Sequence, residues 1–228
     1  SILAQTHRPI EVLVVDDGSV DQTGAKAREA GATVIGLPEN RGYGAALKVG
    51  IRRARYDIIV IMDADGTYPA QAIPRLLSRI GSADMVVGAR QGRHARRPWT
   101  RAVAKWCLRS LASYLAGRAI PDLNSGMRVM RKALVTRFEH LLPSGFSFTT
   151  TITLATIASD HLIVYEPIEY HERVGDSKIR PGHALDFVLL IVRTMVYFHP
   201  LKVFLPAGAV FFAGGLAKLV HDIVAVSY

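Results

Sequence analysis

The sequence predicts an α/β domain in which a mainly parallel, Rossmann-like sheet is flanked by helices. Short apolar runs alternate with amphipathic segments over the first ninety residues, a pattern typical of βαβ units. Two of these runs end directly in pairs of aspartates, as strands that lead into a ligand site often do. With 228 residues, the chain is long enough for one sizeable domain and an appendage.

The strands and helices follow in order along the chain. Six apolar runs predict strands: Glu11–Val15, Thr33–Leu37, Ile58–Met62, Met85–Val87, Ser125–Met130 and Leu162–Ile168. Segments with helical spacing separate them: Gln22–Ala30, Gly44–Ala54, Ala70–Ile80, Thr100–Ala116 and Phe148–Ala158. The opening SILAQTHRP is typical of the last turns of a helix. Because a strand would normally precede that helix, we expect the N-terminal strand of the domain to be missing here.

Two apolar segments end the chain. Residues 183–200 predict an amphipathic helix that lies at a membrane surface or beneath the domain. Residues 201–228 predict a membrane-associated or transmembrane segment, cut short at Tyr228, in which Val203–Ala217 has no charge and Lys218 and Asp222 follow. A full span needs about 20 apolar residues. The segment therefore crosses with Lys218 reaching the headgroups, or forms one arm of a hairpin; a buried helix is the alternative.

The charge is unevenly distributed. The net charge is +9, and the stretch from Arg90 to Pro121 contains basic residues but no acid. Such a block can contact nucleic acid, anionic lipid or a phosphorylated substrate. The single cysteine, Cys107, excludes an intramolecular disulfide and a cysteine-based zinc cluster, which suits a domain that faces the cytosol.

Carboxylates at strand ends are the first candidate site residues. Asp63 and Asp65 follow the apolar run Ile58–Met62, and ligands of open α/β sheets bind beyond such strand ends. Two acids one residue apart can hold a hard divalent cation, although helix capping also explains a bare DxD pattern. Asp16 and Asp17 end the first strand in the same way and suit the donors of a nucleobase or ribose.

Glycines and basic residues supply further candidates. Gly42 and Gly44 begin a helix, where backbone N–H groups can approach a phosphate or ribose. Arg128 lies in NSGMR, and Arg173 and Lys178 lie in HERVGDSKIR, where they can bind a phosphate. A solvated basic loop is the plainer interpretation of the last two.

The order of these motifs resembles a family-2 glycosyltransferase of the GT-A fold. The motifs are VVDDGSVDQT, NRGYGAAL, MDADGTYP, GAR, NSGMRVMRK and YEPIEYHERVGDSKIRP. Within the family, the chain looks like the polyprenyl-phosphate, dolichol-phosphate-mannose-synthase-like branch. The resemblance implies a GT-A domain over residues 1–182, an interfacial helix over 183–200 and a membrane segment over 201–228.

The resemblance also implies roles for single residues. The donor nucleotide sugar would be bound by Asp16, Asp17, Gly42, Asp63, Ala64 and Asp65, with Mg²⁺ or Mn²⁺ on Asp63 and Asp65. Catalysis would involve Asp65, Arg128, Arg173 and Lys178, and the acceptor phosphate would be bound by Arg90, Arg101, Arg173 and Lys178. Thr67 stands where many relatives have a glutamine.

The expected function is inverting transfer of one hexose from a UDP- or GDP-sugar to a polyprenyl phosphate. The enzyme would be a membrane protein with its catalytic domain facing the cytoplasm and no nucleic-acid partner. One alternative is a family-2 glycosyltransferase with a saccharide or protein acceptor. Another is a non-catalytic α/β module with a basic face.

Overall fold

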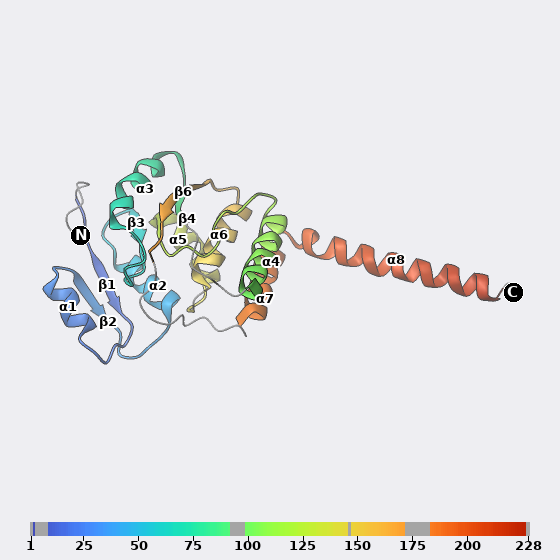
Figure 1. The fold of residues 1–228 in the computed structure, drawn as a ribbon, viewed down its shortest axis with the longest axis horizontal. Coiled ribbons are helices and arrows are strands. Elements are labelled where there is room, and N and C mark those ends of the chain that lie inside the picture. Colours follow the sequence, from blue (N-terminus) through green and yellow to red (C-terminus); the bar gives the residue numbers. More distant parts are fainter. Residues whose placement is uncertain (1, 3–8, 92–98, 146, 172–182, 227–228) are drawn as a thin grey trace.

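A computed structural model describes residues 2, 9–91, 99–145, 147–171 and 183–226 (Figure 1). The first part of the chain forms a small parallel sheet of β1 (Leu13–Asp16) and β2 (Thr33–Gly36), with Leu13 opposite Thr33. Helix α1 (Thr23–Glu29) connects the two strands, and α2 (Tyr43–Arg53) follows and packs on β1. The helix expected in the opening residues falls largely outside the described ranges.

The larger sheet has the strand order β3-β5-β4-β6. Its strands are β3 (Ile58–Ile61), β4 (Met85–Gln91), β5 (Arg128–Arg131) and β6 (Ile163–Glu169). β4 and β6 are parallel, whereas β5 runs antiparallel to β3 and β4. The α/β class is confirmed, but the larger sheet is mixed. The first residue of β5, Arg128, pairs with Val87, and Met130 pairs with Met85. The chain therefore enters β5 on the side where β4 ends and runs antiparallel to β4.

Side chains of the larger sheet alternate between two hydrophobic layers. Val86 and Val129 face the layer that contains α3, while Met85 and Met130 face the layer that contains α6. The helices on the two faces are η2 (Ala70–Ala72), α3 (Ile73–Arg79), η3 (Ile80–Ser82), α5 (Lys132–Phe138), η4 (Glu139–Leu141) and α6 (Phe148–Ala158). Helix α6 is buried from Phe148 to Ile157, which makes it the central helix of the domain.

Three helices form the C-terminal side of the domain. Helix α4 (Trp99–Ala116) packs against α7 (His183–Phe198), and α7 also packs against α6 and the start of α8 (Pro200–Val226). Figure 1 shows α8 extending away from the domain as a single helix. Its span Pro200–Ala225 is long and apolar enough to cross a membrane, with a mean hydropathy of 1.8, and none of that window is buried.

Candidate functional site

Three segments that are distant in sequence meet at the carboxyl end of β3. They are the turn Asp63–Tyr68, the loop Asp122–Gly126 and the first residue of α2, Tyr43. The Tyr43 hydroxyl donates a hydrogen bond to Asp63 Oδ1 at 3.0 Å. Burial first, and then the charge and hydrogen bond of Asp63, raise the pKa of Tyr43, which keeps its hydroxyl protonated. Gly126 lies so close to Asp63 that an added Cβ would be 2.3 Å from Oδ2.

The second acid of the turn is held by a neighbouring threonine. Thr67 donates two hydrogen bonds to Asp65 Oδ1, from its hydroxyl at 2.5 Å and from its backbone N–H at 3.2 Å. Thr67 is fully buried, and its carbonyl accepts a hydrogen bond from the His171 N–H at 2.9 Å. This contact attaches the chain that follows β6 to the acidic turn. Ala64, between the two acids, is exposed.

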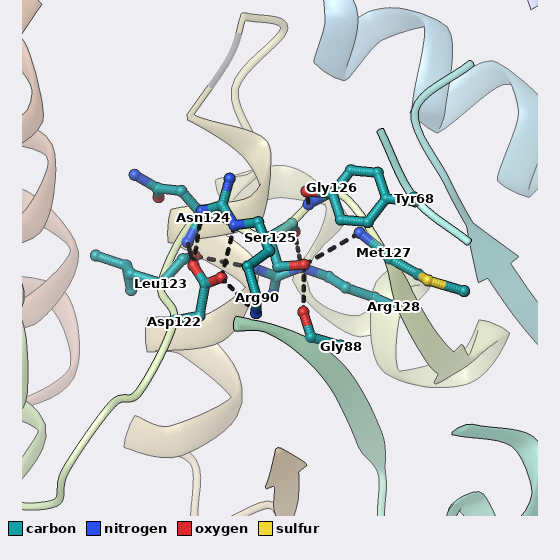
Figure 2. Close-up of polar contacts among 10 residues, drawn as sticks. All are labelled: Tyr68, Gly88, Arg90, Asp122, Leu123, Asn124, Ser125, Gly126, Met127 and Arg128. Carbon is teal, nitrogen blue, oxygen red and sulfur yellow. Dashed lines mark hydrogen bonds and ion pairs between the residues drawn. The ribbon is translucent and has the colours of Figure 1, made fainter. Parts of the chain in front are cut away.

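The loop Asp122–Gly126 is fixed from two sides (Figure 2). The Gly126 N–H donates to the Tyr68 hydroxyl at 2.6 Å, which joins the loop to the acidic turn. The Ser125 hydroxyl donates to the Gly88 carbonyl at 2.6 Å, which joins the loop to β4. The backbone of the loop is therefore fixed to both the acidic turn and β4.

Arg90 and Asp122 form an ion pair with two parallel contacts (Figure 2). Arg90 Nε lies 2.7 Å from Asp122 Oδ2, Arg90 Nη2 lies 2.8 Å from Oδ1, and the Arg90 N–H also donates to Oδ2. Burial alone would raise the pKa of Asp122, but the hydrogen bonds and charge of Arg90 hold it below the ordinary value. Arg90 also lies 5.3 Å from the ring centroid of Tyr170. Arg90, predicted to bind an acceptor phosphate, is thus neutralised within the protein.

Arg128 is the largest buried polar side chain, and it is fully inaccessible to solvent. Its guanidinium donates to the carbonyls of Ser125 and Leu123 at 2.8 and 2.9 Å, and to the Thr153 hydroxyl at 2.6 Å. Burial lowers the pKa of Arg128. In the structure the guanidinium of Arg128 makes these contacts with the protein itself, and its contact with a phosphate stays a prediction. Its donors hold the Asp122–Gly126 loop against α6.

The paired acids at the end of β1, Asp16 and Asp17, also bind the protein's own backbone. Asp16 accepts a hydrogen bond from the Ser19 N–H at 2.9 Å. The side chain of Ser19 first, and then its backbone N–H, lower the pKa of Asp16. Asp17 accepts hydrogen bonds from the N–H groups of Arg41 and Gly42 at 2.8 and 2.9 Å. The Gly42 N–H, predicted to face a ligand, is therefore donated to Asp17.

Gly44 has a packing role. A Cβ on Gly44 would lie 2.2 Å from the Pro143 carbonyl oxygen, and the neighbouring Ala45 N–H donates to the Ser144 carbonyl at 3.0 Å. The start of α2 thus abuts the segment that precedes α6. Glycine is needed here for the approach of two backbones, and the ligand contact stays a prediction.

Three basic residues that were predicted to bind phosphate lie where the structure describes no side chain. Arg101 lies in α4, but its side chain is outside the described part of the structure. Arg173 and Lys178 fall within residues 172–182, which are also outside it.

Sequence reasoning did not identify four features that position the acidic turn and the loop beside it. They are Tyr43, Tyr68, Asp122 and the hydrogen bonds that Thr67 donates to Asp65. A signal existed for Asp122, which is the only acid between Asp84 and Glu139, in a strongly basic stretch. A lone carboxylate among many cations is expected to pair with one of them. The hydroxyls of Tyr43 and Thr67 gave no comparable signal, because their partners depend on how the segments pack.

A family model described as "Glycosyl transferase family 2" matches residues 1–138, more than half of the chain. The chain belongs to glycosyl transferase family 2. The resemblance to the polyprenyl-phosphate branch is also confirmed. An undecaprenyl-phosphate mannosyltransferase of Micrococcus luteus is 30% identical over 197 residues, covering 80% of this chain and 81% of the relative. A dolichyl-phosphate hexose transferase of Haloferax volcanii is 34% identical over 187 residues, covering 79% and 80%.

The GT-A fold of this family 2 glycosyltransferase is confirmed by solved structures. Glucosyl-3-phosphoglycerate synthase from Mycobacterium tuberculosis, in complex with Mn²⁺, uridine diphosphate and phosphoglyceric acid, superposes with a TM-score of 0.66. It is 19% identical, and the match covers 81% of this chain and 67% of that one. At this identity the likeness shows the fold.

The acidic turn of the family 2 glycosyltransferase fits a hard divalent cation. Among the described residues, no group of three or more His, Cys, Asp and Glu side chains can hold a metal ion alone. Asp63 and Asp65 nevertheless supply carboxylate oxygens from one turn, the donors that Mg²⁺ and Mn²⁺ prefer. Mg²⁺ in particular is commonly held by one or two carboxylates together with substrate phosphates and water. The donor set therefore suits a cation that binds together with a diphosphate.

Proposed function

We propose that this protein transfers a single hexose from a UDP- or GDP-sugar to a polyprenyl phosphate, with inversion at the anomeric carbon. The proposal rests on one observation: an acidic turn at the end of β3 belongs to a domain from which the exposed apolar helix α8 extends. It is supported by relatives named for undecaprenyl-phosphate and dolichyl-phosphate transfer, which align over about four fifths of the chain.

The proposed reaction is a single displacement. An oxygen of the lipid phosphate forms a bond to the anomeric carbon as the bond from that carbon to the diphosphate oxygen breaks. The nucleoside diphosphate leaves with the bonding electron pair, so the anomeric configuration inverts. Because a phosphate monoester is ionised near neutral pH, the acceptor needs no general base to attack.

The acidic turn has a defined task in this reaction. Asp63 and Asp65 would hold Mg²⁺ or Mn²⁺, and the bound cation would supply positive charge for the leaving diphosphate. Asp16 and Asp17 border the nucleoside side of the site, and Arg101, Arg173 and Lys178 supply positive charge for the acceptor phosphate. Arg90 acts through Asp122, with which it forms the ion pair.

The C-terminal helices would place this site at a membrane. Trp106 and Tyr114 of α4 and Tyr197 of α7 are exposed, and aromatic side chains favour the headgroup region. Helix α8 begins directly after α7, and Lys202 near its start reaches the Leu115 carbonyl of α4 at 3.4 Å. These aromatic side chains therefore belong to helices that pack beside the start of α8, which supports a site held near the membrane. We infer that the catalytic domain faces the cytosol.

The test uses the full chain in detergent or lipid vesicles with Mn²⁺ or Mg²⁺. Labelled UDP-glucose and GDP-mannose are offered with undecaprenyl phosphate, and undecaprenol without phosphate is the acceptor control. We expect labelled lipid only with the phosphorylated acceptor, and loss of transfer in Asp65→Asn or with EDTA. Full activity of Asp65→Asn in EDTA would refute the proposed role of the cation. Transfer to a saccharide or protein that polyprenyl phosphate does not inhibit would favour the alternative acceptors.

A further inference from the structure

Each carboxylate of the acidic turn accepts a hydrogen bond from a side-chain hydroxyl. Tyr43 donates to Asp63 Oδ1 at 3.0 Å, and Thr67 donates to Asp65 Oδ1 at 2.5 Å. The two hydroxyls come from different elements, the start of α2 and the turn itself. Each hydroxyl fixes one named oxygen of its carboxylate.

Both hydroxyls are held in place by their own backbone. Next to Tyr43, Gly44 packs against the Pro143 carbonyl, and this packing fixes the start of α2. Thr67 is buried, and its carbonyl accepts the hydrogen bond from the His171 N–H. The backbone that carries each donor is thus anchored to another part of the domain.

We propose that Tyr43 and Thr67 are positioning residues that orient Asp63 and Asp65 for a divalent cation bound with a nucleoside diphosphate. This inference rests on the proposed function. The terminal torsion of a free aspartate is broad, so an unsupported carboxylate samples many orientations. Hydrogen-bond donors behind metal ligands restrict them, and removing such a donor typically weakens metal affinity about 10- to 100-fold.

The geometry also changes the interpretation of Thr67. The resemblance to the family places Thr67 where many relatives have a glutamine. In the structure its hydroxyl proton points to Asp65 Oδ1, so Thr67 acts on the carboxylate rather than on the cation. The position thus retains a role in the site through a shorter side chain.

The experiment measures Mn²⁺ binding to the full chain in detergent, with UDP or GDP present. Free Mn²⁺ is quantified by its electron paramagnetic resonance signal, which needs no turnover. The variants are Tyr43→Phe and Thr67→Val, which each remove one hydroxyl, and Thr67→Ser, which restores it. Tyr165→Phe and Thr156→Val are the matched controls. The buried Tyr165 hydroxyl has no hydrogen-bond partner within the described residues, and the Thr156 hydroxyl donates to Ile152 inside α6.

We expect Tyr43→Phe and Thr67→Val to raise the Mn²⁺ dissociation constant about 10- to 100-fold. Thr67→Ser and both controls should bind Mn²⁺ like the wild type, and all variants should retain a cooperative thermal transition. This inference alone would be overturned if the wild type binds Mn²⁺ and neither Tyr43→Phe nor Thr67→Val weakens that binding. It would also be overturned if Thr67→Ser binds Mn²⁺ as weakly as Thr67→Val. A wild type that binds no Mn²⁺ would overturn this inference together with the proposed cation. Normal Mn²⁺ binding without lipid glycosylation would instead overturn the proposed acceptor.

Discussion

Gly126→Ala tests whether the loop Asp122–Gly126 sets the position of the acidic turn. An alanine Cβ at this position would lie 2.3 Å from Asp63 Oδ2, 2.5 Å from Cγ and 2.7 Å from Oδ1. Ordinary Cβ contacts begin at 3.4 Å. The carboxylate or the loop must therefore move by about 1 Å. The loop cannot move freely, because the Gly126 N–H is bound to the Tyr68 hydroxyl.

The size of the effect follows from this displacement. A misplacement of about 1 Å in a reacting constellation can reduce the rate about 100-fold. Adding a methyl group to a packed site costs about 1–3 kcal/mol of stability. Gly126→Ala should therefore remain folded and lose about 100-fold in the rate of sugar transfer.

The assay follows hexose transfer to undecaprenyl phosphate as a function of Mn²⁺ concentration, together with urea unfolding. Gly81→Ala is the control, because a Cβ on Gly81 would meet no atom within 4 Å. A Gly126→Ala enzyme with the wild-type rate and Mn²⁺ dependence would show that the contact with Asp63 does not position the acid.

Three further variants have expected outcomes. Asp122→Asn should lower the free energy of unfolding by about 3 kcal/mol, because it leaves the mostly buried Arg90 without its partner; urea titration measures this. Since the folded pKa of Asp122 is lowered, the pair stabilises fully above about pH 4 and less as the pH falls, and Asp122→Asn should abolish that part of the acid dependence. Arg128→Met should cost about 2 kcal/mol in the same titration, because the Leu123 and Ser125 carbonyls lose a buried donor. A chain ending at His199 should leave the membrane fraction in vesicle flotation, because it lacks α8.

Local patterns were sufficient to predict most elements of the domain. The run Ile58–Met62 predicts β3, which the structure forms at Ile58–Ile61, and Phe148–Ala158 is a helix with the predicted bounds. These features depend on periodicity and turn residues close in sequence. The antiparallel direction of β5 was not predictable in this way. It depends on which end of β4 the chain reaches after α4, and local periodicity carries no information on that.

The roles of charged and glycine residues were harder to predict. Arg128 stands two residues after a glycine in a motif typical of phosphate binding. Its acceptors include Thr153, 25 residues away, which only the packing of α6 brings close. Gly44 begins a helix as phosphate-binding glycines do, yet the group that approaches it is the Pro143 carbonyl. A sequence pattern shows that a close approach is needed, and it does not show whether a ligand or the protein's own backbone makes that approach.

The loop Asp122–Gly126 connects these observations. Its first residue binds Arg90 of β4, its middle is held by Arg128, and its last residue contacts both Tyr68 and Asp63. A change at either arginine therefore acts on the acidic turn through the loop Asp122–Gly126. The hydrogen bonds described above join neither arginine directly to Asp63 or Asp65. We therefore expect Asp122→Asn and Arg128→Met to weaken Mn²⁺ binding as well as stability, whereas a substitution that destabilises a distant part of the domain should change stability alone.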